Sequence, residues 1–523
     1  MWSWKKIICV LVLVAIIARL VRLAMPKEAS TEPTDYKRSF SPRKEAVFFS
    51  RSIDEDDFAD YTDEIFKYTQ QKSEIARDEN FKELTDILHG DLEQLDKVED
   101  AKWAPVFQTP KLGSGSKAKQ RAKADDHDAA PLGKGDTVNI AAAEFEVTQA
   151  HIDQLPKKLR VGLFAKPRVY PAIIRVSHAG GSSVDFIRLA VRLNMAEDPA
   201  AQEQWDQTTS FLAMESVPAF LARDLQELRT MLYMTDKTTG KLTKLFKILP
   251  RLSNVMAIKK EAGLLKDNLF DIITNTEVLA KDYYGCVPYA LGASNIFKFK
   301  FASNHQVNNP LERGGHLTRE ETTLMGKQVS DFLSESGTSF DFQIQIATDK
   351  SKHDINCASC FWGKQGVEAI DIATDGHYRG GYITMGKLRV VKQTLTSVEE
   401  EGAYVNSELD QVLPNSKVLY FNSGNSPFPP VGDVQLFRAW TYDRYNAKYM
   451  SFVLGEKTEE MEDHFFDRKI VGEDKYVPIR GGASANCPFS TILQSLSTEE
   501  AKAEEPAAAE AAEEAKTEEP ADA

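Results

Sequence analysis

Two cysteines in the C-terminal half of the sequence have a spacing that suits redox or metal chemistry. Cys357 and Cys360 are separated by two small residues, as in redox-active dithiols and in one half of many zinc sites. A zinc site needs two further ligands, and His353 is the only near candidate. We therefore interpret the pair as incidental cysteines that can be oxidised, and not as a metal centre.

A second pair of residues combines a cation with a phenol. Arg438 and Tyr442 are four residues apart, which is about one turn of a helix. Tyrosine ordinarily loses its proton near pH 10, and a neighbouring guanidinium favours the charged phenolate, the form that binds a metal ion. The same spacing is common on the surface of ordinary helices, so the pair alone does not define a site.

The elements that position these residues are read from the spacing of apolar side chains. Runs of apolar or alternating residues bounded by Gly, Pro or polar clusters predict a series of strands. These are Ala143 to Val147, Tyr170 to Val176, Ile187 to Leu193, Ile296 to Phe301, Phe340 to Ile346 and Tyr382 to Val391.

Helical spacing of apolar residues occurs before and between the strands. It is found between residues 58 and 68, between 81 and 95, from Ala219 to Met234, from Leu242 to Leu265 and from Glu456 to Phe466. A series of antiparallel strands with segregated helices indicates an α+β fold, and not alternating βαβ units.

The composition fits a globular body with an acidic tail. Of the 523 residues, 42% are hydrophobic and 27% are charged, which is close to globular averages. The net charge of -14 argues against nucleic acid as a partner, although much of it lies in the tail. Residues 496–523 are almost entirely Glu, Ala, Lys, Pro, Asp, Ser and Thr, so we expect this tail to be disordered.

The first residues of the chain predict a contact with a membrane. The apolar run Ile7 to Ala18 is too short to span a bilayer, but if Arg19 and Arg22 snorkel, the segment ending at Met25 approaches the length of about 20 residues that a helix needs. We predict an uncleaved single-pass anchor in residues 1–25, and a cleaved signal peptide or a short interfacial helix are the alternatives. The absence of an Asn-x-Ser/Thr sequon favours a body that faces the cytosol.

The remaining boundaries follow from composition. Residues 26–51 are polar and without periodicity, as in a stalk. Residues 52–135 combine the first two helical patterns with a linker rich in Gly, Ser, Lys and Ala. Residues 136–495 form the main domain in this division.

An ordered series of short motifs fills most of the main domain. It consists of Ala142 to Val147, Leu159 to Phe164, Tyr170 to Ser177, Asp185 with Leu189 to Arg192, Val217 to Asp224, Val287 to Gly292 with Phe297 to Lys300, Phe340 to Gln345, Pro429 to Gly432 and Arg438 to Tyr442. In this order and at these spacings, the series resembles the catalase-like haem-dependent superfamily, from Asp136 to roughly Met450.

The resemblance implies an antiparallel β-barrel with haem buried between the barrel and surrounding helices. In this family a tyrosine phenolate binds the haem iron, and that position falls on Tyr442, with Arg438 beside it. Arg175 falls where the family has an arginine that pairs with a haem propionate, and a carboxylate such as Asp185 is the alternative partner. Phe220 matches a phenylalanine of the family's helix-entry motif, which makes it a further candidate at the cofactor site, with a place in the core as the alternative.

The sequence departs from the family on the distal side of the haem. Ser177 matches a serine that supports a distal histidine, but residues 132–140 contain no histidine. Glu215 or Ser216 occupies the place of the distal asparagine, and Arg188 stands where the family has glycine. Glu215 can replace the histidine as acid and base only if burial raises the pKa of its carboxyl group.

These features predict a membrane-tethered haem protein that acts on a peroxide or a lipid hydroperoxide as an oxidoreductase or isomerase. The missing histidine makes it a poor catalase, because cleavage of a peroxide needs a group that moves a proton between its oxygens. The alternative is a non-enzymatic protein that uses the same fold for binding or scaffolding.

Overall fold

A computed structural model describes the parts of the chain that are discussed from here on. They are residues 40–42, 55–71, 75, 77–86, 137–179, 186–195, 209–215, 219–220, 222–235, 278–307, 319–360, 362, 381–398, 403–406 and 426–441. The segments predicted as membrane anchor and acidic tail, and the helical patterns at 242–265 and 456–466, lie outside them. No helix in these ranges is both long and apolar enough to cross a bilayer.

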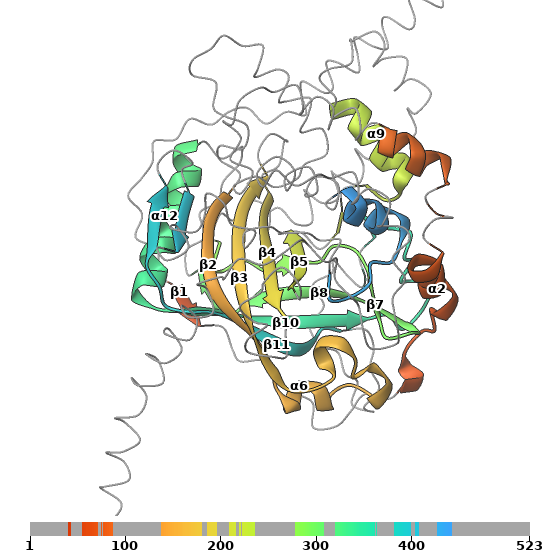
Figure 1. Cartoon of the computed structure of the whole chain (residues 1–523), viewed down its shortest axis with the longest axis horizontal. Helices are drawn as coiled ribbons and strands as arrows, with labels where there is room; N and C mark the ends of the chain where they lie inside the picture. Colours follow the sequence, from red (N-terminus) through yellow and green to blue (C-terminus); the bar gives the residue numbers. More distant parts are fainter. Residues whose placement is uncertain are drawn as a thin grey trace, which may run out of the picture.

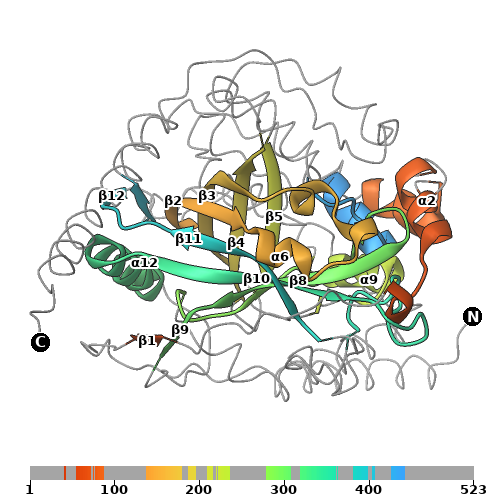
Figure 2. The ribbon, with the colours of Figure 1, turned by 90° about the horizontal axis from the view of Figure 1, so that it is seen from below.

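Antiparallel pairings between strands close a ring. Each strand pairs with the next, and the last, β11, pairs again with the first, β2, so the sheet forms a barrel (Figures 1 and 2). In ring order the strands are β2 (Thr137–Val147), β3 (Arg168–Ala179), β4 (Phe186–Asn194), β5 (Thr209–Glu215), β6 (Tyr283–Tyr284), β8 (Asn295–Ser303), β10 (Thr338–Ile346) and β11 (Ile383–Val390).

The predicted strands are confirmed in β2, β3, β4, β8, β10 and β11, although β2 begins six residues earlier than predicted. The sequence analysis does not predict β5 or β6. Further short strands extend the sheet: β7 (Tyr289–Leu291) pairs with β8, and β12 (Leu395–Val398) forms a hairpin with β13 (Ala403–Asn406). Since β13 pairs with β2 in parallel, the complete sheet is mixed, although its ring is antiparallel.

Aromatic rings fill the interior of the barrel. Phe342 on β10 is fully buried, and its ring centroid lies 5.0 Å from that of Phe301, 5.4 Å from Phe145 and 5.5 Å from Phe299. Phe145 lies on β2 and the other two rings lie on β8, so Phe342 packs against side chains from strands on both sides of β10 in the ring. Burial of large aromatic area in this way is a main source of stability for a core of this size.

Helices lie on two opposite sides of the barrel. α12 (Arg319–Glu335) lies beside β2, β12 and β13, while α2 (Thr62–Gln70), α9 (Leu225–Thr235) and the helical residues 433–441 gather on the other side (Figures 1 and 2). The shorter elements are α6 (Gln149–Asp153) and single helical turns at Glu55–Asp57, Lys157–Leu159 and Gly162–Phe164.

The N-terminal region contributes to the same core. The helical pattern predicted between residues 58 and 68 buries Tyr61, Ile65 and Tyr68, and the pattern that begins at residue 81 buries Phe81 and Leu84. Within the segment predicted as a stalk, β1 (Phe40–Pro42) pairs with β9 (His305–Val307), and the other residues of that segment lie outside the described ranges.

Candidate functional site

One face of β3 carries two of the predicted site residues. Ile174 and Val176 belong to the core cluster, so the alternating residues Arg175 and Ser177 lie on the other face of the strand. Both are nevertheless buried, with 4% and 1% of their surface exposed. A guanidinium held in a buried position suits an anionic partner, because its fork of donors matches a carboxylate.

The strand register places Ser177 and Glu215 in one row. Ser177 lies opposite Arg188 on β4, and Arg188 lies opposite Glu215 at the end of β5. Directly opposed residues are about 5 Å apart, so the backbones of Ser177 and Glu215 are separated by about 10 Å. The side chain of Glu215 is outside the described part of the structure, so its proposed proton transfer stays a prediction.

Arg438 and Phe220, which are far apart in the sequence, meet in the structure. The guanidinium carbon of Arg438 lies 4.8 Å from the centroid of the Phe220 ring, a cation–π arrangement. Arg438 is 8% exposed, and its Nη1 donates a hydrogen bond of 3.3 Å to Oε1 of Gln435. The structure thus brings together two residues that the resemblance assigned to cofactor binding. Tyr442, the third, follows helical residues 433–441 directly and lies outside the described residues.

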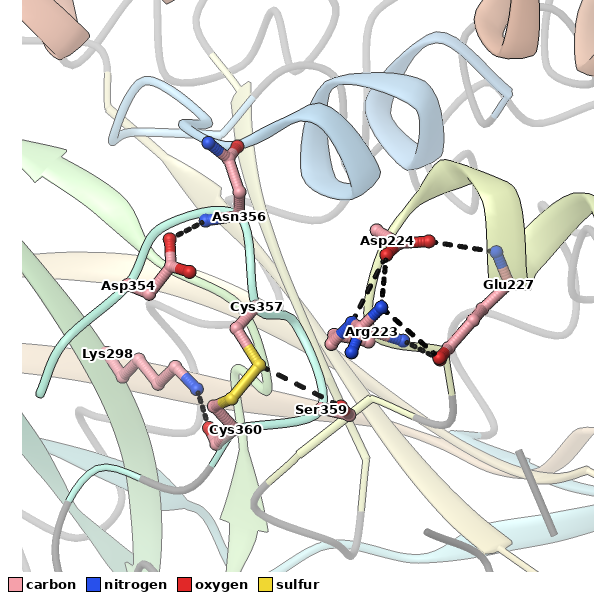
Figure 3. The surroundings of a disulfide bond; sticks show 9 residues. All are labelled: Arg223, Asp224, Glu227, Lys298, Asp354, Asn356, Cys357, Ser359 and Cys360. Atoms are coloured by element: carbon pink, nitrogen blue, oxygen red, sulfur yellow. Dashed lines mark hydrogen bonds and ion pairs between the residues drawn. A yellow bond between two sulfur atoms is a disulfide. The ribbon is translucent and has the colours of Figure 1, made fainter. Parts of the chain in front are cut away.

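The disulfide loop, defined as residues 353–360, lies beside this contact. Cys357 and Cys360 form a disulfide, with their Cα atoms 5.3 Å apart. Ala358 between them accepts a hydrogen bond of 3.0 Å from the backbone N–H of Phe220 and donates one of 2.8 Å to the carbonyl of Arg223. Figure 3 shows the loop between the barrel and the start of α9.

The same loop contacts the helical segment that carries Arg438. Gly432 precedes that segment with a φ of +91°, and a Cβ atom there would collide with the carbonyl oxygen of Ile355. The hydroxyl of Tyr68 on α2 lies 2.8 Å from Oδ1 of Asn356 and 2.8 Å from Oδ1 of Asp433. The loop, α2 and the Arg438 segment therefore share one partly buried polar junction.

His151 and His353, two of the described histidines, have local structural roles and do not take the place of the missing distal histidine. Nδ1 of His151 accepts a hydrogen bond from the backbone N–H of Thr148, so this side chain caps α6, and burial lowers its pKa to about 4. Nδ1 of His353 lies within 3.3 Å of the backbone N–H groups of Thr348 and Asp349, and its pKa is lowered mainly by burial. His353 therefore stabilises a turn, and no cluster of potential metal ligands occurs in the described ranges.

The donor set of the described residues fits haem in two respects. Arg175 is a buried cation on the non-core face of β3, which suits a propionate partner, and Arg438 is a buried arginine four residues before Tyr442 in the sequence. The fit thus rests on the chemistry and burial of the two arginines, while the phenolate ligand stays a prediction.

The sequence analysis does not single out a second buried arginine on the face of the sheet that carries Arg175. Arg192 on β4 lies opposite Ile173 and is 1% exposed. The signal for it is the alternation of β4, in which Arg188, Ala190 and Arg192 separate the core residues Leu189 and Val191. Because side chains alternate between the two faces of a strand, this pattern predicts that the arginines of β4 lie on the same face of the sheet as Arg175.

Comparisons with known proteins find similarity among solved structures. A bacterial catalase matches with a TM-score of 0.39 and 13% identity over 68% of this chain, and the chain spans 62% of that protein's length. A fungal catalase matches with a TM-score of 0.40 and 13% identity over 67% of this chain and 68% of that one. Catalase A from Saccharomyces cerevisiae matches with a TM-score of 0.37 and 13% identity over 66% of this chain and 69% of that one.

All three of these solved structures are catalases. Their activities and ligands are properties of those proteins. No protein-family model matches the chain, and neither does any curated protein sequence.

Proposed function

We propose that this protein binds haem on the outer face of its barrel and acts on a hydroperoxide. The observation that carries the proposal is the stacking of Arg438 on Phe220, because it joins two motifs that the sequence analysis assigned to the same cofactor site. A buried guanidinium at this place favours a phenolate at Tyr442, one helical turn further along the chain.

In this proposal each arginine has a separate task. Arg175 pairs with a propionate and fixes the orientation of the cofactor, while Arg438 stabilises the negative charge of the ligating phenolate. When bound, the haem iron supplies the redox centre at which the peroxide bond is cleaved. The protein's own contribution is to hold this group in a buried site and to move one proton at the distal side.

The distal proton transfer is assigned to Glu215, with Ser177 in the same row of residues. Arg188 stands between them, and a cationic neighbour favours the charged form of a carboxyl group. We expect Glu215 to work first as a base that accepts the hydroperoxide proton. Because the cationic neighbour makes the carboxylate a weak base, this uptake of the proton is the unfavourable step, and we expect slow turnover of hydrogen peroxide.

A lipid hydroperoxide is the preferred substrate in this proposal. Its alkyl chain adds apolar contacts that hydrogen peroxide lacks, and an anchor in residues 1–25 would keep the site near the bilayer that supplies it. Removal of residues 1–25 should release the protein from vesicles into the soluble fraction. If the shortened protein stays on vesicles after a high-salt wash, a second membrane contact exists.

The experiment that tests the proposal compares haem content and turnover in matched variants. Full-length protein is purified with ample haem and assayed with a fatty-acid hydroperoxide and with hydrogen peroxide. Arg175→Leu and Arg438→Leu should lower haem content, whereas Arg389→Leu, which removes a half-exposed arginine of β11, should not. Glu215→Gln should keep haem and lose about 100-fold in turnover.

Two results would overturn the proposal in different ways. Full haem content in Arg175→Leu and Arg438→Leu would remove both arginines from the cofactor site. Haem without turnover of either peroxide would leave a haem-binding protein with no such activity, and the binding or scaffolding alternative would replace the enzyme.

A further inference from the structure

The disulfide between Cys357 and Cys360 joins two residues of unequal exposure. Cys357 is 5% exposed, whereas Cys360 is partly exposed to solvent. Structural disulfides are rare in proteins that face the cytosol, where paired cysteines at this spacing are more often exchangeable. With the body on the cytosolic side, as the sequence analysis predicts, the disulfide is therefore accessible to reducing thiols through Cys360.

The surroundings tie the disulfide to a specific neighbouring segment. Two backbone hydrogen bonds hold Ala358 against residues 220 and 223, and Nζ of Lys298 donates a hydrogen bond of 2.9 Å to the carbonyl of Cys360. Lys298 is buried and also lies 5.1 Å from the centroid of the Trp362 ring. The main chain of Cys360 is thus fixed to the barrel while Ala358 supports the segment before α9.

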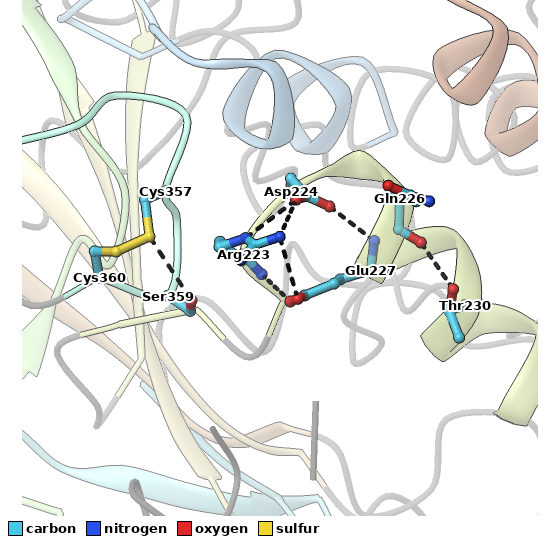
Figure 4. Close-up of polar contacts among 8 residues, drawn as sticks. All are labelled: Arg223, Asp224, Gln226, Glu227, Thr230, Cys357, Ser359 and Cys360. Carbon is cyan, nitrogen blue, oxygen red and sulfur yellow. Dashed lines mark hydrogen bonds and ion pairs between the residues drawn. A yellow bond between two sulfur atoms is a disulfide. The ribbon is translucent and has the colours of Figure 1, made fainter. Parts of the chain in front are cut away.

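That segment sets the start of α9. Oδ1 of Asp224 accepts a hydrogen bond of 2.9 Å from the backbone N–H of Glu227, and Oε2 of Glu227 accepts one of 2.9 Å from the backbone N–H of Arg223. Figure 4 shows this cap beside the disulfide. Ala358 and the cap of α9 therefore hold the two ends of residues 220–224, and Phe220 projects from that segment toward Arg438.

We propose that Cys357 and Cys360 form a reversible thiol–disulfide exchange site for cellular dithiols, and that the state of this pair controls residues 220–224. In the disulfide form the bond constrains the turn between the two cysteines, and the backbone of Ala358 forms its hydrogen bonds with Phe220 and Arg223. In the dithiol form the covalent constraint on the turn is absent, so the two hydrogen bonds of Ala358 open more often.

The exchange needs only a dithiol as reductant. A thiolate of the dithiol attacks Sγ of Cys360, which belongs to the more exposed residue of the pair, and the bond between the two cysteines breaks with Cys357 leaving as a thiolate. Oγ of Ser359 lies 4.0 Å from Sγ of Cys357 and can donate a hydrogen bond to it. The second thiol then releases Cys360, so the protein gains two electrons and two protons and the reductant becomes a disulfide.

The consequence for the haem site rests on the proposed function, while the control of residues 220–224 does not. If Phe220 moves when Ala358 releases it, Arg438 loses the ring on which its guanidinium is stacked. A less constrained Arg438 stabilises the Tyr442 phenolate less well. Reduction should therefore weaken haem retention.

Hydrogen exchange of the full-length protein tests the inference. The amide protons of Phe220 and Ala358 are followed in oxidised protein and after treatment with dithiothreitol, with thiols at residues 357 and 360 counted by alkylation and peptide mass. We expect two new thiols and about ten-fold faster exchange at both amides. A protein carrying both Cys357→Ser and Cys360→Ser should exchange fast in both conditions, whereas Cys286→Ser, which changes a buried cysteine outside the disulfide, should behave as the unmodified chain.

The outcomes separate this inference from the proposed function. Failure of dithiothreitol to reduce the pair in folded protein, or unchanged exchange at Phe220 and Ala358 after reduction, overturns the switch even if haem is bound. Faster exchange in a protein that never binds haem supports the switch and contradicts the proposed function. Because reduction acts on protein that is already folded, the test does not depend on whether the serine variants fold.

Discussion

The hydroxyl of Tyr68 offers a sharp test of how the Arg438 segment is held. It lies 2.8 Å from the carboxylate of Asp433 and 2.8 Å from the side-chain oxygen of Asn356, and Tyr68 is 1% exposed. Burial and the charge of Asp433 raise the pKa of Tyr68 far above its ordinary value, so the hydroxyl keeps its proton. A hydroxyl has one hydrogen, and the carboxylate is the stronger acceptor, so Asp433 takes it.

Replacing Tyr68 with Phe removes this hydrogen bond and keeps the ring. A hydrogen bond to a charged acceptor contributes about 1.5–3 kcal/mol to the free energy of unfolding, whereas one to a neutral acceptor contributes about 0.5–1.5 kcal/mol. Tyr61→Phe is the matched control, since Tyr61 lies next to the same helix, is 2% exposed and donates to the neutral carbonyl of His353 at 2.8 Å.

Urea unfolding followed by tryptophan fluorescence measures both variants. We expect Tyr68→Phe to lower the free energy of unfolding by about 1 kcal/mol more than Tyr61→Phe, with unchanged slope against urea. If Tyr61→Phe costs as much as Tyr68→Phe or more, the carboxylate of Asp433 does not use this hydroxyl, and the junction described between α2, the disulfide loop and residues 433–441 is wrong.

Two further predictions concern the core. Burial lowers the pKa of Lys281 to about 7, and its amine makes no hydrogen bond with the described residues. Between pH 7 and 10 the unfolded chain binds more protons at this residue than the folded one, so it makes stability rise with pH. Lys281→Met should therefore be more stable than the unmodified protein at pH 7, and a difference in melting temperature that does not shrink toward pH 10 would contradict this. Phe342→Ala should lower the free energy of unfolding by about 3–5 kcal/mol, because the packed rings around it cannot close the cavity, and a loss below 1 kcal/mol in urea unfolding would show that they can.

Six of the eight strands of the ring could be predicted because their signal is local, whereas the sequence analysis does not predict β5 or the two-residue strand β6. In β2, β3 and β4 alternate residues belong to the core, so apolar side chains recur at period 2 within each segment. The sequence analysis does not predict α12, although its buried residues Met325, Val329 and Leu333 recur at helical spacing, since Gly326 lowers the helix propensity of the segment. A Cβ atom there would come within 2.9 Å of the Tyr404 ring, so the glycine allows the helix to approach the sheet closely.

The start of α9 shows where local patterns stop being informative. The apolar spacing predicts a helix from Ala219, but the helix begins at Leu225. The backbone of residues 220 and 223 forms hydrogen bonds with Ala358 instead of continuing the helix, and Asp224 provides the cap. A partner so distant in the sequence cannot be read from helical periodicity.

The candidate site also has one part that could be predicted from the sequence and one part that could not. Arg175 and Ser177 could be placed on one face of a strand from the sequence, because alternation fixes faces. The stacking of Arg438 on Phe220 could not, since it depends on how the disulfide loop brings the two segments together. Residue type and motif order thus indicate the members of the site, while their contacts come from packing alone.

The most direct test of haem binding through Tyr442 is a titration of haem into the full-length protein and the Tyr442→Phe variant, followed by absorbance near the Soret band. We predict saturable binding of one haem by the unmodified chain, with a spectrum of phenolate ligation, and loss of that spectrum or of binding in the variant, whose ring volume is nearly unchanged. No Soret absorbance with excess haem, or identical spectra for both proteins, would contradict the account.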